Sequence, residues 1–262
     1  MRRTGLRFRI NLFLVAAVSL NLAFWFGAHD TQARWEGVPP VPTKNGARIM
    51  TLGDEQFSYR FGAITLQNLG NSGGRVTAIK DYDYKKLGAW FWLLHGLDPA
   101  SNHVPMMAAY YFGATQVPED VAVVVEYLGT IGQNPVANKW RWLAHAIFLA
   151  RHRMENPALA LDLAYILSRM QPVGDVLPAW ARQMPAFVLA NQGEKETARK
   201  VIEEILMTAT ELHPNEVNFM RAYLVEELDT PEQEVQQIIN MRGNDLMRDA
   251  SAPSKTLPAF EP

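Results

Sequence analysis

Apolar positions along the chain follow two patterns, one continuous and one periodic. Residues 10–28 form an uncharged, mostly apolar run, INLFLVAAVSLNLAFWFGA, whereas after residue 48 apolar residues recur every three or four positions. The run would form a helix of roughly 28 Å, close to the ~30 Å hydrocarbon core of a membrane. The periodic part predicts amphipathic helices, and it lacks the sustained two-residue alternation that indicates strands. The sequence therefore predicts an all-α protein.

The expected helices begin at recognisable residues. Asn156-Pro157 reads as an N-cap followed by proline at the first helical position, and His213-Pro214 marks a comparable start. Pro118 is followed by two acidic residues, which the helix dipole favours in a first turn. On this basis we expect helices at 54–69, 82–96, 101–114, 118–132, 137–153, 157–170, 176–191, 195–211, 214–228 and 231–241. The glycine-rich stretch 70–74 is expected to form a turn between the first two.

The charges around the apolar run indicate its orientation. Arginine occupies positions 2, 3, 7 and 9, and residues 1–27 contain no acid. The positive-inside rule then places residues 1–9 in the cytoplasm and everything after residue 28 across the membrane. This arrangement is typical of a bacterial inner-membrane protein with a single transmembrane helix at 10–28 and a periplasmic body.

Two other interpretations of the amino terminus stay open. A cleavable signal peptide has the same polarity, but its apolar region is usually shorter and ends at small residues. Here the run ends in Phe24-Trp25-Phe26, and TQA at 31–33 is a poor cleavage site. A twin-arginine signal is the second alternative. It lacks the expected apolar residue at Gly5.

Small residues line one face of the apolar run. Ala16, Ser19, Ala23 and Gly27 are three or four residues apart, so a helix would place them together. Small residues allow membrane helices to approach closely, which makes these four candidates for packing against another membrane helix. Chance spacing in an alanine-rich helix is the alternative.

The remaining segments divide the chain by composition. Pro39, Pro40 and Pro42 lie within 29–47, which we interpret as a stiff linker that holds the body away from the membrane. Residues 48–241 form the helical domain. The polar, proline-containing segment 242–262 is expected to be a flexible tail.

Alanine recurs at a fixed spacing within the helical domain. Ala122, Ala160 and Ala198 are 38 residues apart, each early in the second helix of an expected hairpin. A period of this size with two helices per unit is typical of a helical solenoid. Each unit can bury its apolar faces only by stacking on its neighbours.

The repeat resembles the tetratricopeptide repeat (TPR) family. In ANQGEKETARKV, Gly193 precedes Ala198 by five residues, and Pro172 follows Ala160 by twelve, as in that motif. The resemblance implies an α-solenoid of antiparallel helical hairpins whose concave face binds protein segments. Proline follows the other two alanines by thirteen and sixteen residues, and the family's Trp-Leu-Gly pattern is not kept. A relative with slightly longer repeats, such as the Sel1-like type, is therefore the other possibility.

Composition excludes several kinds of chemistry. The chain has no cysteine, which rules out disulfides, thiolate zinc sites and cysteine nucleophiles. The arginines before residue 10 leave a net charge of −6 on residues 28–262, which argues against nucleic acid as a partner. The six histidines form no known metal-ligand pattern, and nucleotide-binding glycine loops and the G-x-S-x-G motif are missing. We therefore expect no catalytic residue, no metal and no cofactor, and a protein that is not an enzyme.

Tryptophans are the candidates for contact with a partner. Trp140, Trp142 and Trp180 are close in sequence, and aromatic side chains dominate binding hot spots. Packing between hairpins is the alternative. The leading hypothesis is a membrane-anchored periplasmic TPR-like scaffold that binds a protein partner and assists assembly of an envelope complex. The alternative is a stoichiometric accessory subunit of a multi-subunit inner-membrane complex.

Overall fold

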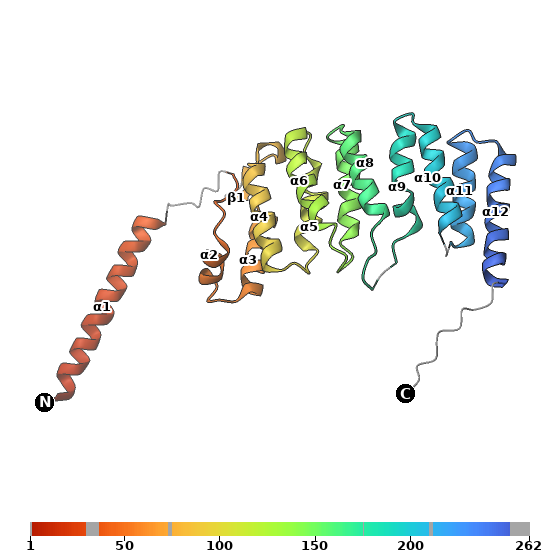
Figure 1. Cartoon of the computed structure of the whole chain (residues 1–262). Helices are drawn as coiled ribbons and strands as arrows, with labels where there is room; N and C mark the ends of the chain where they lie inside the picture. Colours follow the sequence, from red (N-terminus) through yellow and green to blue (C-terminus); the bar gives the residue numbers. More distant parts are fainter. Residues whose placement is uncertain (1, 30–36, 73–74, 175, 210–211, 252–262) are drawn as a thin grey trace, which may run out of the picture.

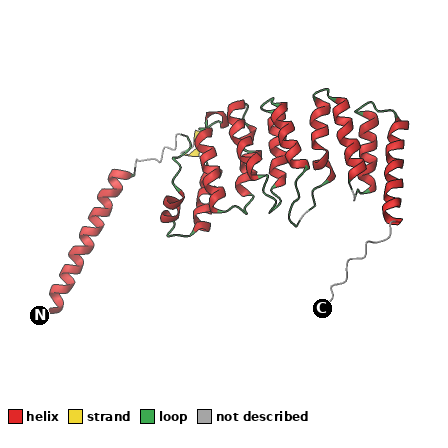
Figure 2. Ribbon diagram, in the orientation of Figure 1, coloured by secondary structure: helices red, strands yellow, loops and turns green. Residues whose placement is uncertain are grey.

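The described residues are mostly helical, and successive helices of the body stand side by side in a row (Figures 1 and 2). The structure is a computed structural model and describes residues 2–29, 37–72, 75–174, 176–209 and 212–251. Its α-helices are α1 (Arg2–Ala28), α2 (Lys44–Met50), α3 (Glu55–Gln67), α4 (Tyr84–Leu97), α5 (His103–Tyr110), α6 (Pro118–Ile131), α7 (Trp140–His152), α8 (Pro157–Ser168), α9 (Ala179–Asn191), α10 (Lys195–Thr208), α11 (Pro214–Glu226) and α12 (Glu232–Ser251). Two 3-10 turns, η1 (Ile79–Asp81) and η2 (Phe112–Ala114), complete the helical segments. The all-α prediction is confirmed, and the consecutive packed pairs are compatible with a helical repeat.

One short β ladder interrupts this pattern. Strands β1 (Asn71–Ser72) and β2 (Arg75–Val76) pair antiparallel and close the turn between α3 and α4. The turn was predicted, but the ladder was not, because two residues per strand leave no alternation to detect. Gly70 begins the turn with φ +82°, and the Tyr82 hydroxyl stands about where a Cβ would lie. The same hydroxyl donates a hydrogen bond to the Leu69 carbonyl oxygen.

Side-chain caps define the helix starts that the sequence predicted. The Asn156 side chain accepts a hydrogen bond from the Leu159 backbone, with Pro157 at the first helical position of α8. At the start of α11, His213 and Glu216 form a reciprocal capping box. These local bonds satisfy backbone donors that a helix leaves free, so α8 and α11 begin at residues that the sequence specifies.

The second helices of the five pairs share one buried position. The fourth residue of α4, α6, α8, α10 and α12 is fully buried in each case. These residues are Leu87, Val121, Ala160, Ala198 and Val235. Successive members lie 34, 39, 38 and 37 residues apart. The helix pairs thus repeat in structure with a variable rather than a constant spacing.

This register corrects the alanine spacing inferred from sequence. Ala160 and Ala198 occupy the shared position as predicted, but Ala122 is only half-buried and Val121 takes its place. The reason is that α6 begins at Pro118, which is 39 residues before the start of α8 at Pro157. The prediction that Ala160 is buried in a helix packed against α7 is confirmed.

The body begins earlier in the chain than the boundary at residue 48 implied. Val38 is buried, and the Pro39 carbonyl oxygen accepts a 2.9 Å hydrogen bond from Trp90 Nε1. Helix α2 starts at Lys44, whose Nζ donates to the Gly96 carbonyl oxygen at 2.7 Å. Residues 37–47 are therefore fastened to α4. Residues 30–36 of the expected linker lie outside the described residues.

The last helix also extends further than expected. Helix α12 continues to Ser251, ten residues beyond the predicted end at 241, so the first part of the expected tail is helical. Arg242 is buried and donates to the Leu206 carbonyl oxygen at 2.8 Å, which fixes α12 to α10. Residues 252–262 lie outside the described residues.

The core consists of two clusters that meet in α9. The first runs from Val38 to Val188, and the second includes α10, α11 and the start of α12. Within α9, Ala181 and Val188 belong to the first cluster, whereas Ala186 and Leu189 belong to the second. Pro185 lies inside this helix, directly before Ala186.

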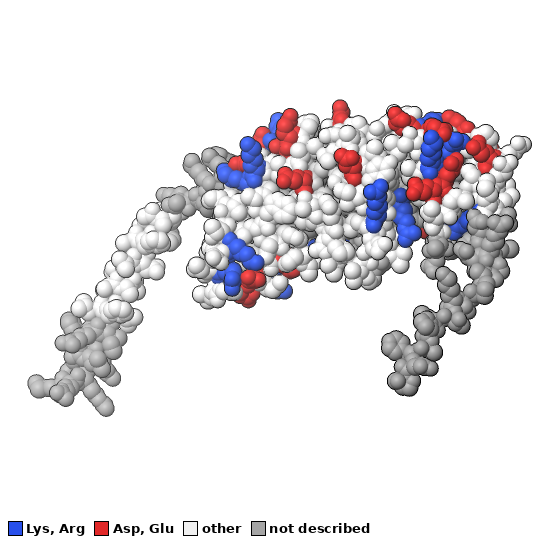
Figure 3. Space-filling view, viewed as in Figure 1, with Lys and Arg blue, Asp and Glu red and all other residues white. Residues whose placement is uncertain are grey.

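Helix α1 is long and apolar enough to cross a membrane by its length and composition. The stretch Asn11–Ala28 has no buried residue, and its surface is uncharged throughout (Figure 3). Charged side chains gather instead on the body, most densely over α10–α12 at the right of the view.

Candidate partner-binding face

The three tryptophans singled out from sequence lie in different environments. Trp140 is buried, and its ring packs against Trp180 with centroids 5.7 Å apart. Trp180 keeps 42% of its surface exposed. Trp142 is half-buried, and its Nε1 donates a 2.7 Å hydrogen bond to Asn102. Trp140 thus serves the core, whereas Trp142 and Trp180 present surface to solvent.

Helix α7 carries an aromatic stripe that continues onto α5. Trp142, His145, Phe148 and His152 are three or four residues apart and share one side of the helix. Tyr110 of α5 packs edge-on against His145 at 4.7 Å and lies 6.3 Å from Trp142. Phe148 contacts the rings of His145 and His152 at 5.8 and 4.8 Å. The stripe therefore connects neighbouring first helices of two pairs.

A second aromatic group lies on the first helices of the next two pairs. Phe187 of α9 packs edge-on against Phe219 and Tyr223 of α11, at 6.1 and 5.1 Å. Phe219 and Tyr223 stack at 6.0 Å. Because both groups belong to α5, α7, α9 and α11, we name them together the aromatic face. It comprises Tyr110, Trp142, His145, Phe148, His152, Phe187, Phe219 and Tyr223.

The aromatic face is largely uncharged at neutral pH. Burial lowers the pKa of His145, although its ring nitrogen Nε2 donates to the Ala109 carbonyl oxygen. Burial also lowers the pKa of His152, with a further contribution from the positive charge of Arg151. Burial raises the pKa of Tyr223, so its hydroxyl stays protonated. The face is therefore suited to apolar and aromatic groups rather than to a strongly charged ligand.

A shallow hollow adjoins the face between α7 and α9. Arg151, His152 and Glu155 line one side of it, and Val188 and Gln192 line the other. It is an open depression with mixed polar and apolar walls, the kind of surface on which a side chain of a partner can rest at the rim of an interface.

Most of the aromatic face was missed from sequence. The signal was the spacing of aromatic residues along WRWLAHAIFLARH, which puts 142, 145, 148 and 152 opposite the buried 140, 143, 147 and 150. A tryptophan count alone does not separate these two sides. Phe148, with 49% of its surface exposed, is the residue that this pattern would have identified.

No feature of the described residues resembles a metal centre. Among them, no three His, Asp or Glu side chains are grouped in a way that could hold an ion. Ala16, Ser19, Ala23 and Gly27 are exposed, as are the other side chains of α1 between residues 11 and 27, so their role in packing stays a prediction. Comparison with protein families, curated proteins and solved structures found no match.

Proposed function

We propose that this protein is a membrane-anchored periplasmic scaffold of the TPR-like kind, which binds a segment of a protein partner and assists assembly of an envelope complex. The observation that carries the proposal is the aromatic face, which extends over the first helices of four successive pairs. Rigid aromatic rings offer large contact areas at a low cost in side-chain entropy.

Two features of the helix pairs support the TPR-like part of the proposal. The buried fourth position recurs in five second helices, at spacings of 34 to 39 residues. Gly193 has φ +83° in the turn between α9 and α10, a conformation that favours glycine, and Ala198 is fully buried five residues later. The positions of Gly193 and Ala198 therefore support a hairpin of the TPR-like kind.

The chemistry of the face indicates the kind of segment that it binds. Its histidines are neutral at pH 7, and its exposed rings are those of Tyr110, Phe148 and Phe219. An extended or helical segment with apolar side chains at regular spacing would bury these rings. The segment would lie across α5, α7, α9 and α11.

Photo-crosslinking in native membranes tests this function. A photoreactive phenylalanine analogue at Phe148 is expected to form a defined crosslinked band with one other protein, because that ring belongs to the aromatic face and about half of its surface is exposed. Mass spectrometry of the band identifies the partner. Adding Tyr110→Ser and Phe219→Ser to the same chain should weaken the band about tenfold or more, as expected for loss of two hot-spot rings.

The control places the same analogue at Asp162. This residue is exposed on α8, a second helix, and contacts no ring of the aromatic face. It should give no comparable band. Equal crosslinking from both positions, or a band at Phe148 that survives the two serine substitutions unchanged, would contradict the proposal.

The proposed topology makes a separate prediction. Four arginines precede the apolar run and none of the first 27 residues is acidic, so the carboxyl terminus should lie outside the cytoplasm. A reporter enzyme that is active only in the periplasm, fused after Pro262, should be active. A reporter that folds only in the cytoplasm should be silent in the same place, and the reverse pair of results would overturn the orientation.

The exposed small residues of α1 favour a second candidate, a stoichiometric accessory subunit. Ala16, Ser19, Ala23 and Gly27 offer a smooth surface to another membrane helix. Purification in mild detergent separates the candidates. A partner in a fixed ratio that is lost on Ala23→Leu supports the subunit, whereas a substoichiometric partner that depends on Phe148 supports the scaffold.

A further inference from the structure

The end of the body nearest α1 in sequence exposes large apolar side chains. They belong to the end of α2, the turn after it and the outer side of α3. We name this set the N-terminal edge: Ile49, Met50, Leu52, Phe57, Phe61 and Ile64. Ile49, Met50 and Leu52 keep 76%, 71% and 99% of their surface exposed, and the other three keep more than half. So large an exposed apolar set on one end marks an interaction surface.

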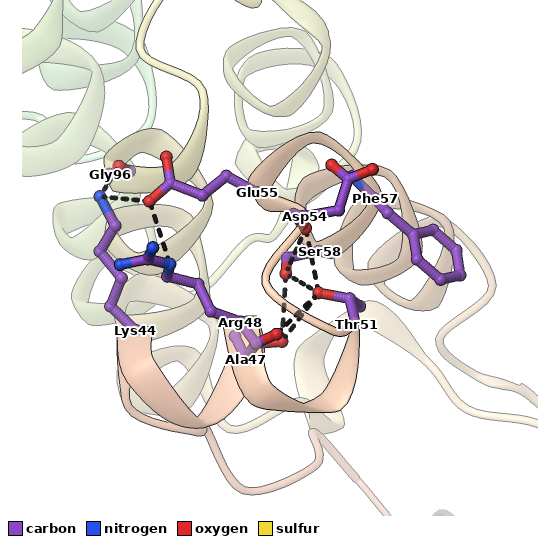
Figure 4. A network of polar contacts seen from close by, with 9 residues as sticks. All are labelled: Lys44, Ala47, Arg48, Thr51, Asp54, Glu55, Phe57, Ser58 and Gly96. Atoms are coloured by element: carbon purple, nitrogen blue, oxygen red, sulfur yellow. Dashed lines mark hydrogen bonds and ion pairs between the residues drawn. The ribbon is translucent and has the colours of Figure 1, made fainter.

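The turn that presents Leu52 is held by a buried polar network (Figure 4). Thr51 Oγ1 and Ser58 Oγ lie within hydrogen-bonding distance of each other, and both also lie within that distance of the carbonyl oxygens of Ala47 and Asp54. The two hydroxyl protons are shared among these acceptors. Leu52 has φ +56°, in the left-handed region that bulky residues avoid. The network therefore holds the backbone of Leu52 in a fixed conformation in which its side chain is exposed.

Backbone N–H groups of this turn donate to carbonyl oxygens within the protein. Leu52 N donates to the Ile49 carbonyl oxygen, Gly53 N to that of Arg48 and Asp54 N to that of Thr51. A backbone that needs few bonds to water can enter the interfacial region of a membrane without a large desolvation cost. This property separates the turn from an ordinary water-exposed loop.

The opposite end of the row, at α12, has a more polar surface. The exposed side chains of α12 up to residue 241 are mostly polar, with Met241 as the exposed apolar exception, as the terminal helix of a helical row requires. The polar ones include Gln233, Gln236, Gln237 and Asn240. The N-terminal edge is apolar instead, which indicates that another molecular surface covers it.

Chain length and charge identify what covers it. Ten residues along the chain separate Ala28, the end of α1, from the buried Val38, so the two are at most about 35 Å apart. The charged residues of α2, α3 and the turn between them carry a local charge of +1 on a body whose total is negative. They are Lys44, Arg48 and Arg60 against Asp54 and Glu55. Both Lys44 and Arg48 lie within 4 Å of Glu55, at 3.8 and 3.4 Å, which leaves that acid neutralised (Figure 4).

We propose that the N-terminal edge lies in the headgroup region of a phospholipid membrane that contains anionic lipids. Leu52, Ile49 and Met50 enter the boundary with the lipid tails, and Lys44 and Arg48 lie at the level of the lipid phosphates, as in membrane-surface helices. The inference rests on the anchoring part of the proposed function, because α1 holds the edge near the bilayer. This contact would hold one end of the row of helices at the membrane and leave the aromatic face open to water.

A fluorescent probe at single positions tests the proposal. The chain has no cysteine, so one introduced cysteine can be labelled alone. Leu52→Cys and Ile49→Cys, each carrying an environment-sensitive fluorophore, are placed in the full chain and reconstituted in vesicles of phosphatidylcholine and phosphatidylglycerol. The matched control is Gln237→Cys on the polar side of α12. Flotation of the vesicles reports anchoring, and lipids with a spin label near the headgroup end of the tail report depth.

The expected result is blue-shifted emission at positions 49 and 52, with loss of most of it when spin-labelled lipid is added, and no change at position 237. Water-like emission at 49 and 52 in chains that float would overturn this inference and leave the anchor intact. Blue-shifted emission that spin-labelled lipid does not quench would also overturn it, since a second copy of the chain would then cover the edge. Chains that fail to float would overturn both the inference and the anchor.

Discussion

Replacing Gly132 with alanine should lower the free energy of unfolding by about 3 kcal/mol, the upper part of the range for overpacked sites. Gly132 caps α6 where it meets α7, and a Cβ there would lie 2.4 Å from the Leu143 backbone nitrogen and 2.7 Å from the Leu128 carbonyl oxygen. Both are backbone atoms, so neither can move without shifting a helix. Urea unfolding of the full chain in detergent, followed by tryptophan fluorescence, measures the loss.

Gly96→Ala is the matched control. Gly96 lies inside α4, and nothing stands within 4 Å of the position that its Cβ would take. Alanine should therefore stabilise the helix by up to about 1 kcal/mol through its higher helix propensity. Similar effects of the two substitutions would show that α6 and α7 do not cross as closely as the structure has them.

Replacing Ala160 with leucine is the second large perturbation. Ala160 is fully buried in α8 at the position shared by all five second helices, and α8 packs against both α7 and α9. Three added carbon atoms should force these helices apart at a cost of about 1–3 kcal/mol. Thermal unfolding followed by far-UV circular dichroism should show a lower midpoint.

Its control lies two residues away on the same helix. Ala158 is exposed in the first turn of α8, so Ala158→Leu changes the chain by the same atoms without filling a packed space. The free energy of unfolding of this variant should stay within about 0.5 kcal/mol of the parent's, as for ordinary surface substitutions. Its thermal midpoint should therefore hardly change. A midpoint that falls equally for both would contradict the assigned register.

Local signals account for what sequence could predict of the fold. Asn156-Pro157 and His213-Pro214 cap their helices through their own side chains, so the starts of α8 and α11 follow from a few adjacent residues. Helix α2 was not predicted, although Thr43 caps it through its side chain. It is seven residues long, directly follows a proline-rich stretch, and depends on a distant bond from Lys44 to Gly96. Contacts of that kind come from the fold rather than from local pattern.

The candidate site was harder to predict because burial decides it. Trp140 and Trp142 are two residues apart in sequence, yet one is in the core and the other belongs to the aromatic face. The helical spacing puts them on different sides of α7, and the packing of α7 against α6 and α8 decides which side is buried. The N-terminal edge was missed for the same reason, since Phe57 and Phe61 match the apolar spacing of a buried helix side.

The division of the core within α9 has a mechanical consequence. Pro185 has no N–H to donate to the preceding turn, so the helix lacks one internal bond where the two clusters meet. A helix bends most easily where its backbone hydrogen bonds are already interrupted. We therefore expect bending within α9 to occur at Pro185, although this helix packs closely against both α8 and α10. Flexing there changes the distance between the ring of Phe148 on one side and those of Phe219 and Tyr223 on the other, so the aromatic face can adjust its span to segments of different length.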